Sequence, residues 1–170
     1  MWVTVHLCSG LGLGAVWPGP SWAAAPAAMV EHALLDAVPH WDYTRHPRRV
    51  VWGALDVAAA LAVMAAAARR ARGRPGGGAA LLAGAAAALP DLDVIDGLFP
   101  GRASGATRRR LFPSHVQGYP HGEAGPLLGV SLQLLTVAIA MVLFARRFPR
   151  RRQTPAADRE TSFAARRAGC

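Results

Sequence analysis

One uninterrupted apolar stretch constrains this chain more than any other feature. Residues 124–145 read AGPLLGVSLQLLTVAIAMVLFA, without a charged side chain, and RRFPRRR follows at once. As an α-helix this stretch is long enough to cross the hydrocarbon core of a bilayer, and arginines directly after it are typical of the end of a span. A buried helix of a soluble protein is the alternative, but the length and the basic flank favour a transmembrane helix.

Four further segments have the apolar, alanine-rich composition of helices that pack together in a membrane. They are residues 1–17, 21–40, 50–68 and 77–96. Pro90 should kink or restart the last of them, because proline lacks the amide hydrogen of an interior helical residue. The first is short for a full span, and PGP at 18–20 separates it from the next, which favours a tight helical hairpin. The sequence therefore predicts an all-α fold, a helical transmembrane bundle of about four to five helices.

The N-terminal and C-terminal segments differ in composition, and each supports its own prediction. WAAA at 22–25 resembles a signal-peptide cleavage site, but no arginine or lysine precedes Arg45, so the positive charge that opens such a peptide is missing. The hairpin is the better interpretation of the N-terminal part. At the other end, residues 149–170 are charged and poor in apolar side chains, which predicts a disordered Arg-rich tail after a helical membrane domain at 1–148.

The basic residues indicate a lipid bilayer, and no nucleic acid, as the partner. All 19 are arginine, and they stand in short clusters beside apolar runs, whereas a nucleic-acid-binding face interleaves basic with polar and aromatic residues. If the five segments alternate in direction, seven arginines fall at the end that holds the N-terminus and twelve at the other end. This excess predicts a multi-pass protein of the cell (inner) membrane with its C-terminal tail in the cytoplasm.

The two cysteines form no C-x-x-C pair, so neither a disulfide framework nor a thiolate zinc site is expected.

The same alternation of segments gathers almost all acidic and imidazole groups before the tail at one end of the bundle. They are His6, His32, Asp36, His40, Asp42, His46, Asp56, Asp91, Asp93, Asp96, His115, His121 and Glu123. A random scatter would divide them between the two ends.

Three of these groups follow one another at intervals of four in EHALLDAVPHWDY, residues 31–43. On an α-helix, His32, Asp36 and His40 would lie along one stripe. Imidazoles combined with carboxylates are ligands of zinc, manganese or iron, and ionisable groups within a membrane segment usually face a bundle interior or a cavity. The alternative is that they cap a helix end in the headgroup region.

The motif LPDLD at 89–93 offers oxygen ligands at the same end. Pro90 suits the first turn of a restarted helix, and Asp91 and Asp93 complement the positive end of its dipole. They would therefore serve either as helix caps or as two carboxylates delivered to the histidine-rich face.

The loop SHVQGYPHGE at 114–123 adds His115 and His121 just before the last apolar segment. Glu123 could orient a ligand histidine, act as a general base, or merely place a negative charge at a helix N-terminus. Asp56, in an alanine-rich segment, needs a metal, a histidine or an arginine as its partner.

These motifs resemble those of small bacterial integral membrane proteins known as membrane-bound metal-dependent hydrolases. The likeness covers about residues 4–145 and is most specific in HALLDAVPHWDY, where the family commonly reads SHxLLDxxPHxxY and Glu31 stands in place of the serine. It extends to His6 and Gly10 near the start, to LPDLD, and to Gln133 in the last segment. The resemblance implies a helical membrane protein with His and Asp metal ligands. By motif position these are His6, His32, Asp36, His40, Asp91, Asp93 and His121.

The residues and the resemblance together predict a hydrolase whose divalent metal, Zn or Mn, would lower the pKa of a bound water and act on a phosphoester or lipid at the interface. The predicted ligands are His6, His32, Asp36, His40, Asp91, Asp93, His115 and His121, with Glu123 and Asp56 as catalytic residues. Two alternatives stay open. One is a non-enzymatic membrane protein whose His and Asp residues serve helix packing and topology. The other is an ion or proton pathway through Asp56, which would spread polar groups through the bilayer depth.

Overall fold

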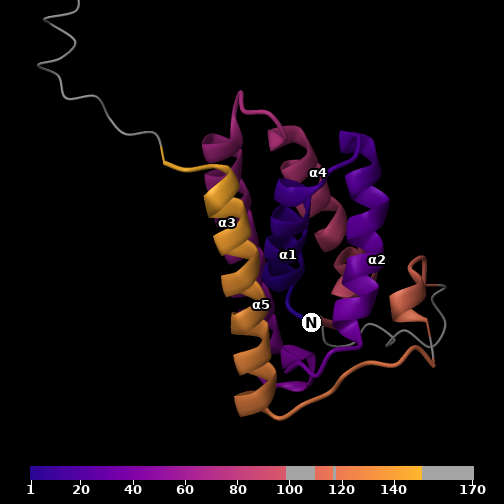
Figure 1. Cartoon of the computed structure of the whole chain (residues 1–170). Helices are drawn as coiled ribbons and strands as arrows, with labels where there is room; N and C mark the ends of the chain where they lie inside the picture. The colour runs from indigo at the N-terminus through magenta and orange to yellow at the C-terminus, as the bar shows by residue number, and fades with distance from the viewer. Residues whose placement is uncertain (99–109, 117, 151–170) are drawn as a thin grey trace, which may run out of the picture.

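The computed structural model describes residues 1–98, 110–116 and 118–150, and this part of the chain is helical (Figure 1). The α-helices are α1 (Val3–Val16), α2 (Ala24–Asp36), α3 (Arg49–Ala71), α4 (Gly77–Ala88) and α5 (Pro126–Arg147). Four short 3₁₀ helices are η1 (Ser21–Ala23), η2 (Tyr43–Arg45), η3 (Leu89–Leu98) and η4 (Pro113–His115). The all-α prediction with five helices is confirmed. The predicted disordered tail lies, from residue 151 on, outside the described residues.

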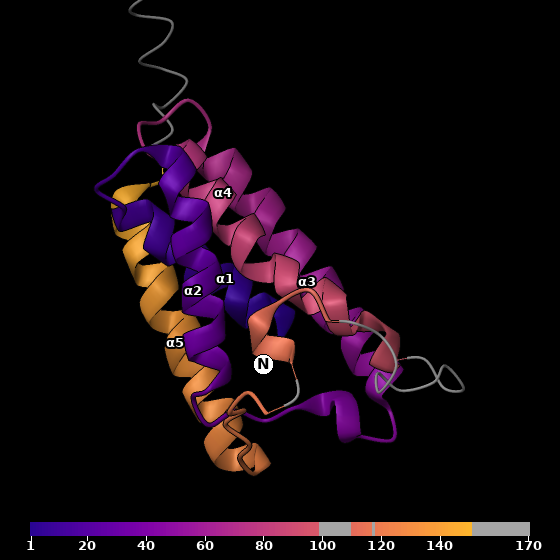
Figure 2. The same cartoon turned by 90° about the vertical axis from the view of Figure 1, so that its right-hand side faces the viewer.

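The five α-helices alternate in direction and pack side by side, with α1 inside the group formed by the others (Figures 1 and 2). The chain turns between α1 and α2 at 17–20, where the sequence predicted a hairpin. At Leu89 the α-helix gives way to η3, because Pro90 cannot continue the α-helical hydrogen bonding. The alternation places the N-terminus of α1, the end of α2 and the start of α5 at one end of the bundle.

Helix α1 packs closely because glycines replace side chains along two of its faces. A Cβ atom added at Gly14 would lie 2.6 Å from the Cα of Ala80 in α4, and one at Gly12 would lie 2.8 Å from the Cα of Ala140 in α5. Such contacts between small residues let helix backbones approach one another, as they do in membrane bundles. They hold α1 against α4 and α5 at once.

In the part of the chain that the structure describes, two helices are long and apolar enough to cross a membrane, namely α3 and α5. Only 22% of the most apolar window of each is buried within the protein, so most of these side chains point outward. Among them are Leu55, Leu61, Leu134, Leu135 and Ile139. A soluble protein rarely leaves so many large apolar side chains exposed on two long helices.

The end of the bundle opposite the N-terminus is closed by arginines. The Arg74 guanidinium donates to the carbonyl oxygen of Pro149 at 2.6 Å, and Arg147 donates to that of Pro75 at 3.2 Å. Arg70 reaches the carbonyl oxygen of Phe148. These cations lie where α3 and α5 end, so they complement the negative ends of both helix dipoles.

Candidate metal centre

The centre is built around Asp36, the last residue of α2. Its carboxylate is 1% exposed, and its two oxygens face different neighbours. Oδ1 lies 3.1 Å from Nε2 of His6, from the start of α1, while Oδ2 lies 3.1 Å from Nε2 of His32 and 3.6 Å from Nε2 of His115. The amino group of Met1 also donates to Oδ1 at 3.1 Å. One buried carboxylate therefore joins α1, α2 and the loop before α5.

His40 is positioned at the centre by the loop before α5 and not, as its spacing predicts, by helix α2. The α-helix ends at Asp36, so His40 does not continue the helical stripe of His32 and Asp36. Pro39 disfavours helical backbone in the residue before it, and the chain turns there. His40 instead pairs with Gly122, accepting from Ala124 and donating to the Gly122 carbonyl. This pairing brings it beside His121, with ring centroids 6.4 Å apart.

Asp91 is supplied by η3, directly after α4. Its side chain is 9% exposed, and donor atoms of Asp91, His32 and His115 all lie within 4.8 Å of one another. The α4 backbone brings them together, because the Ala87 carbonyl oxygen lies 2.7 Å from Nδ1 of His32. The end of α4 thus contributes an anchor for the His32 ring, and η3 contributes a carboxylate beside it.

Among the described residues, three groups of side chains could each hold a metal ion, with donor atoms within 4.8 Å of one another. They are His6, His32 and Asp36; His32, Asp91 and His115; and Asp36, His40 and His121. The first group is fully buried, whereas the third includes the exposed His121. Seven of the eight predicted ligands therefore belong to these groups, and Asp93 is the one that does not.

The ring orientations of two histidines suit metal binding. Nδ1 of His32 is 2.7 Å from the Ala87 carbonyl oxygen, and Nδ1 of His40 is 2.8 Å from that of Val38. A carbonyl oxygen only accepts, so both rings carry their proton on Nδ1 and, when neutral, offer a lone pair on Nε2. This is how proteins orient histidine ligands. Burial lowers the pKa of His40, which favours the neutral ring that a metal requires.

Several polar atoms at the centre are buried without a hydrogen bond to any described residue. Nε2 of His32 and Oδ2 of Asp36 are among them although they lie 3.1 Å apart, and Oδ2 of Asp91 is a third. Polar atoms buried away from water usually have partners, so these call for an explanation. With Nδ1 protonated, a neutral His32 directs its lone pair at a carboxylate, and a cation would satisfy both. The donor set therefore fits a divalent metal.

The structure shows Asp56, one of the two predicted catalytic residues, at the N-terminus of a neighbouring helix. Its oxygens accept from the backbone amides of Val3 at 2.8 Å and Thr4 at 3.0 Å, and from the Tyr43 hydroxyl at 3.1 Å. Asp56 thus caps the N-terminus of α1 from α3, where a negative charge is favourable. It belongs to none of the three ligand groups.

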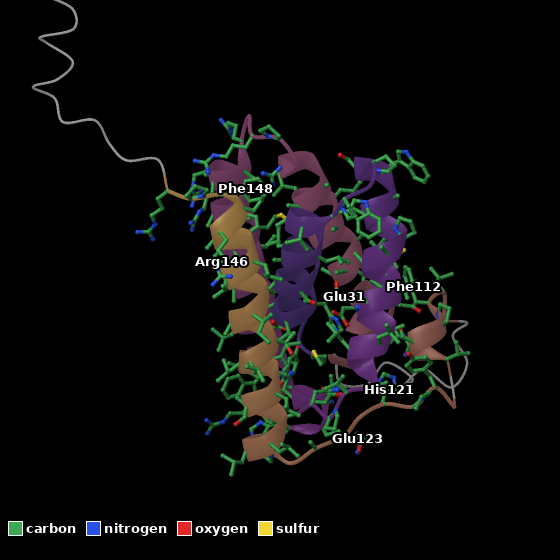
Figure 3. The ribbon with its side chains drawn as sticks, in the orientation of Figure 1. Glu31, Phe112, His121, Glu123, Arg146 and Phe148 are labelled. Atoms are coloured by element: carbon green, nitrogen blue, oxygen red, sulfur yellow. The ribbon has the colours of Figure 1, made fainter. Side chains whose placement is uncertain are left out.

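Glu123, the other predicted catalytic residue, is also placed outside the groups. It forms a bidentate ion pair with Arg45, at 2.8 Å and 2.5 Å, and both side chains are largely exposed. In Figure 3 it lies on the loop that leads to α5, at the lower end of the bundle. The backbone around Glu123 nevertheless helps to position His40, because residues 122 and 124 form hydrogen bonds with it.

Asp93 positions a loop rather than facing the other ligands. Its Oδ2 accepts from the backbone amides of Leu111 at 2.7 Å and Phe112 at 3.3 Å, and its carbonyl oxygen accepts from Arg110. These bonds hold the start of η4, the short helix that carries His115. Asp93 therefore acts on the centre through His115.

A partly buried contact that the motifs did not indicate joins α1 and α2. The Ser9 hydroxyl donates to the Glu31 carboxylate, and the labelled Glu31 lies between these helices in Figure 3. The two residues are 22 positions apart, and their pairing depends on the packing of the helices. The contact of the Ala87 carbonyl with His32 also depends on helix packing. A sequence motif of side chains cannot indicate it, because the Ala87 group involved is a backbone carbonyl.

Comparisons with protein-family models, with curated proteins and with solved structures find no match to this chain. The resemblance to membrane-bound metal-dependent hydrolases therefore stays a prediction from its motifs. The candidate centre is supported by the positions of its own side chains.

Proposed function

We propose that this chain is a membrane protein that binds a divalent metal, zinc or manganese, at one end of its helical bundle and uses it to hydrolyse a phosphoester or a lipid. The observation that carries the proposal is the His32 ring. Its Nδ1 is anchored by the Ala87 carbonyl, and its Nε2 faces Asp36 beside Asp91 and His115. A divalent ion held there would polarise an ester and lower the pKa of a water molecule.

The membrane part of the proposal is supported by the outer surface of α3 and α5 and by an aromatic cluster at the end that carries the centre. Trp2, Trp41 and Trp52 lie with ring centroids 6.0–6.4 Å apart, and Tyr43 adjoins Trp2. Tryptophan and tyrosine are enriched where a bilayer meets water. The centre would thus lie near the headgroups, on the face of the cell membrane opposite the arginine-rich end and its cytoplasmic tail.

The proposal is tested by purifying the full chain in detergent, loading it with Zn²⁺ or Mn²⁺, and measuring bound metal by mass spectrometry and hydrolysis of bis-p-nitrophenyl phosphate and of short-chain phospholipid. We expect bound metal and hydrolysis for the native chain, and loss of both for the double variant His32→Ala with His40→Ala. The matched control is His46→Ala, since His46 is the only histidine outside the three ligand groups. A native chain that remains free of metal after loading contradicts the proposal.

A structural role is the second candidate, and one observation favours it. Asp36 lies within 3.1 Å of both His6 and His32, so protonated rings would form buried ion pairs that join α1 to α2. Removing one partner of such a pair is strongly destabilising, by about 3–5 kcal/mol. This role predicts that the histidine variants lose thermal stability while neither they nor the native chain bind metal.

A further inference from the structure

We propose that the centre binds two divalent ions, with the Asp36 carboxylate as the bridge between them. This inference rests on the proposed function, because it presumes that the donor groups bind metal. It adds the number of ions, their unequal exposure and a preference for phosphoester substrates.

The first argument is the number of donors. Among the three ligand groups, the set of His32, Asp91 and His115 and the set of Asp36, His40 and His121 share no residue. His6 supplies a seventh donor beside Asp36. Zinc in proteins is almost always four-coordinate, and a catalytic ion keeps one position open, so a single ion leaves about half of these donors unused.

The second argument is that Asp36, a member of the second set, also lies against the first set. Its Oδ2 adjoins His32 and His115, which belong to the first set, while its Oδ1 adjoins His6 and the amino group of Met1. A carboxylate whose oxygens face different neighbours can give one oxygen to each of two ions. The inner ion would take His32, Asp91, His115 and Oδ2, while the outer ion would take Oδ1, His40 and His121.

The outer position already attracts positive charge, since the Met1 amino group lies 3.1 Å from Oδ1. An ion there would replace this contact. The outer position also includes His121, which is exposed, whereas His32 and Asp91 of the inner position are buried. The two ions should therefore differ in how readily a chelator removes them.

Charge and spacing select the substrate class. Two divalent ions beside the two carboxylates of Asp36 and Asp91 leave a net positive charge, whereas one ion leaves none. A net positive centre suits an anionic phosphoester better than a neutral carboxylic ester. Two ions about 3.5–4 Å apart can contact both the attacking and the leaving oxygen of a phosphoryl displacement. In the reaction, a water oxygen bonds to phosphorus, the ester P–O bond breaks, and the released alcohol takes a proton from that water.

The test is the metal content and the electron paramagnetic resonance spectrum of the full chain in detergent, loaded with Mn²⁺. We expect about two ions per chain and the spectrum of an exchange-coupled pair. The variant His121→Ala should keep about one ion, with the spectrum of isolated Mn²⁺, and His46→Ala should match the native chain. Because His121 is exposed, its substitution should be compatible with folding, and His121→Asn provides a second variant if it is not.

The outcomes separate this inference from the proposed function. One ion per native chain, with phosphoester hydrolysis retained, overturns the pair and leaves the proposed function intact. Two ions without magnetic coupling overturn the bridge, and two ions retained in both His121 variants overturn the assignment of the outer position. A native chain without metal overturns both proposals.

Discussion

In α2, Nε2 of His32 lies 3.1 Å from Oδ2 of Asp36, one helical turn further along the chain. Nδ1 of the same ring lies 2.7 Å from the carbonyl oxygen of Ala87 in α4. The first contact follows from the spacing of four residues in the sequence. The second depends on α4 packing against α2, and it leaves Nε2 as the ring atom that faces the carboxylate. This orientation, with one ring nitrogen anchored and the other facing a carboxylate, is the one that a metal ligand at His32 would require.

The variant Asp36→Asn tests whether the Asp36 carboxylate is required for metal binding. It keeps the size of the side chain but removes the charge that faces His6, His32 and His115. We expect metal affinity, measured by competition with a fluorescent chelator, to fall by more than about 100-fold, since the loss of a ligand should exceed the 10–100-fold effect of removing a group that orients one. Unchanged affinity would contradict the central place of Asp36.

The variant Asp56→Asn should affect stability and leave the metal in place. Asp56 caps α1 by accepting from the backbone N–H groups of Val3 and Thr4. The asparagine side chain would offer these two donors only one oxygen, and that oxygen carries no charge. We expect a loss of about 1–2 kcal/mol in the free energy of unfolding, as for other helix caps. Thermal unfolding in detergent and metal analysis measure the two effects. Loss of metal at unchanged stability would contradict this assignment of Asp56 as a helix cap.

The variant Asp93→Ala should weaken metal binding indirectly. Without its carboxylate the amides of Leu111 and Phe112 lose their acceptor, and the η4 segment that carries His115 is held less firmly. We expect a loss of affinity of about 10–100-fold, with full occupancy at saturating metal, as for groups that orient a ligand. Zinc or manganese titration of the variant and the native chain gives the comparison. A lower occupancy at saturation would instead identify Asp93 as a ligand.

The substitution Gly14→Ala should destabilise the bundle, while Gly78→Ala should not. A Cβ at Gly14 would lie 2.6 Å from the Cα of Ala80, so α1 and α4 must separate. Gly78, in the first turn of α4, has open space at the same position. There alanine should raise stability by up to about 0.5–1 kcal/mol, because it lowers the entropy of the unfolded chain. Melting temperatures in one detergent compare the pair, and equal effects would contradict the packing described for α1.

The two ends of the bundle should label from opposite sides of the membrane. Ser21 and Gly125 are exposed, at the arginine-rich end and at the metal-centre end, respectively. In a Cys8→Ser and Cys170→Ser background, we expect a membrane-impermeant maleimide to modify Gly125→Cys in intact cells after outer-membrane permeabilisation. Ser21→Cys should react only in inverted vesicles. Labelling of both from the same side would contradict a membrane-spanning bundle.

Much of the fold could be predicted from the sequence because apolar segments, glycines and prolines act locally. The long apolar stretch at 124–145 became α5, the hairpin formed at 17–20, and Pro90 ended the α-helical part of its segment. Alternation of five helices was then enough to predict which end would hold the histidines and aspartates. The extent of the helical stripe was wrong, because Pro39 and the pairing with Gly122 turn the chain before His40.

The roles of individual carboxylates could not be read from the sequence, because they depend on which backbone amides and side chains approach from other helices. Asp36, Asp56, Asp91 and Asp93 look alike as residues near helix ends. Only the packing makes Asp36 the centre of a histidine cluster, Asp56 the cap of α1 and Asp93 the anchor of a loop. The sequence by itself determined the helices and the end at which the ionisable groups gather, since both follow from local composition and chain direction. The tertiary structure decided which groups face one another, since contacts over 30 or more residues exist only once α1, α2 and α4 have packed.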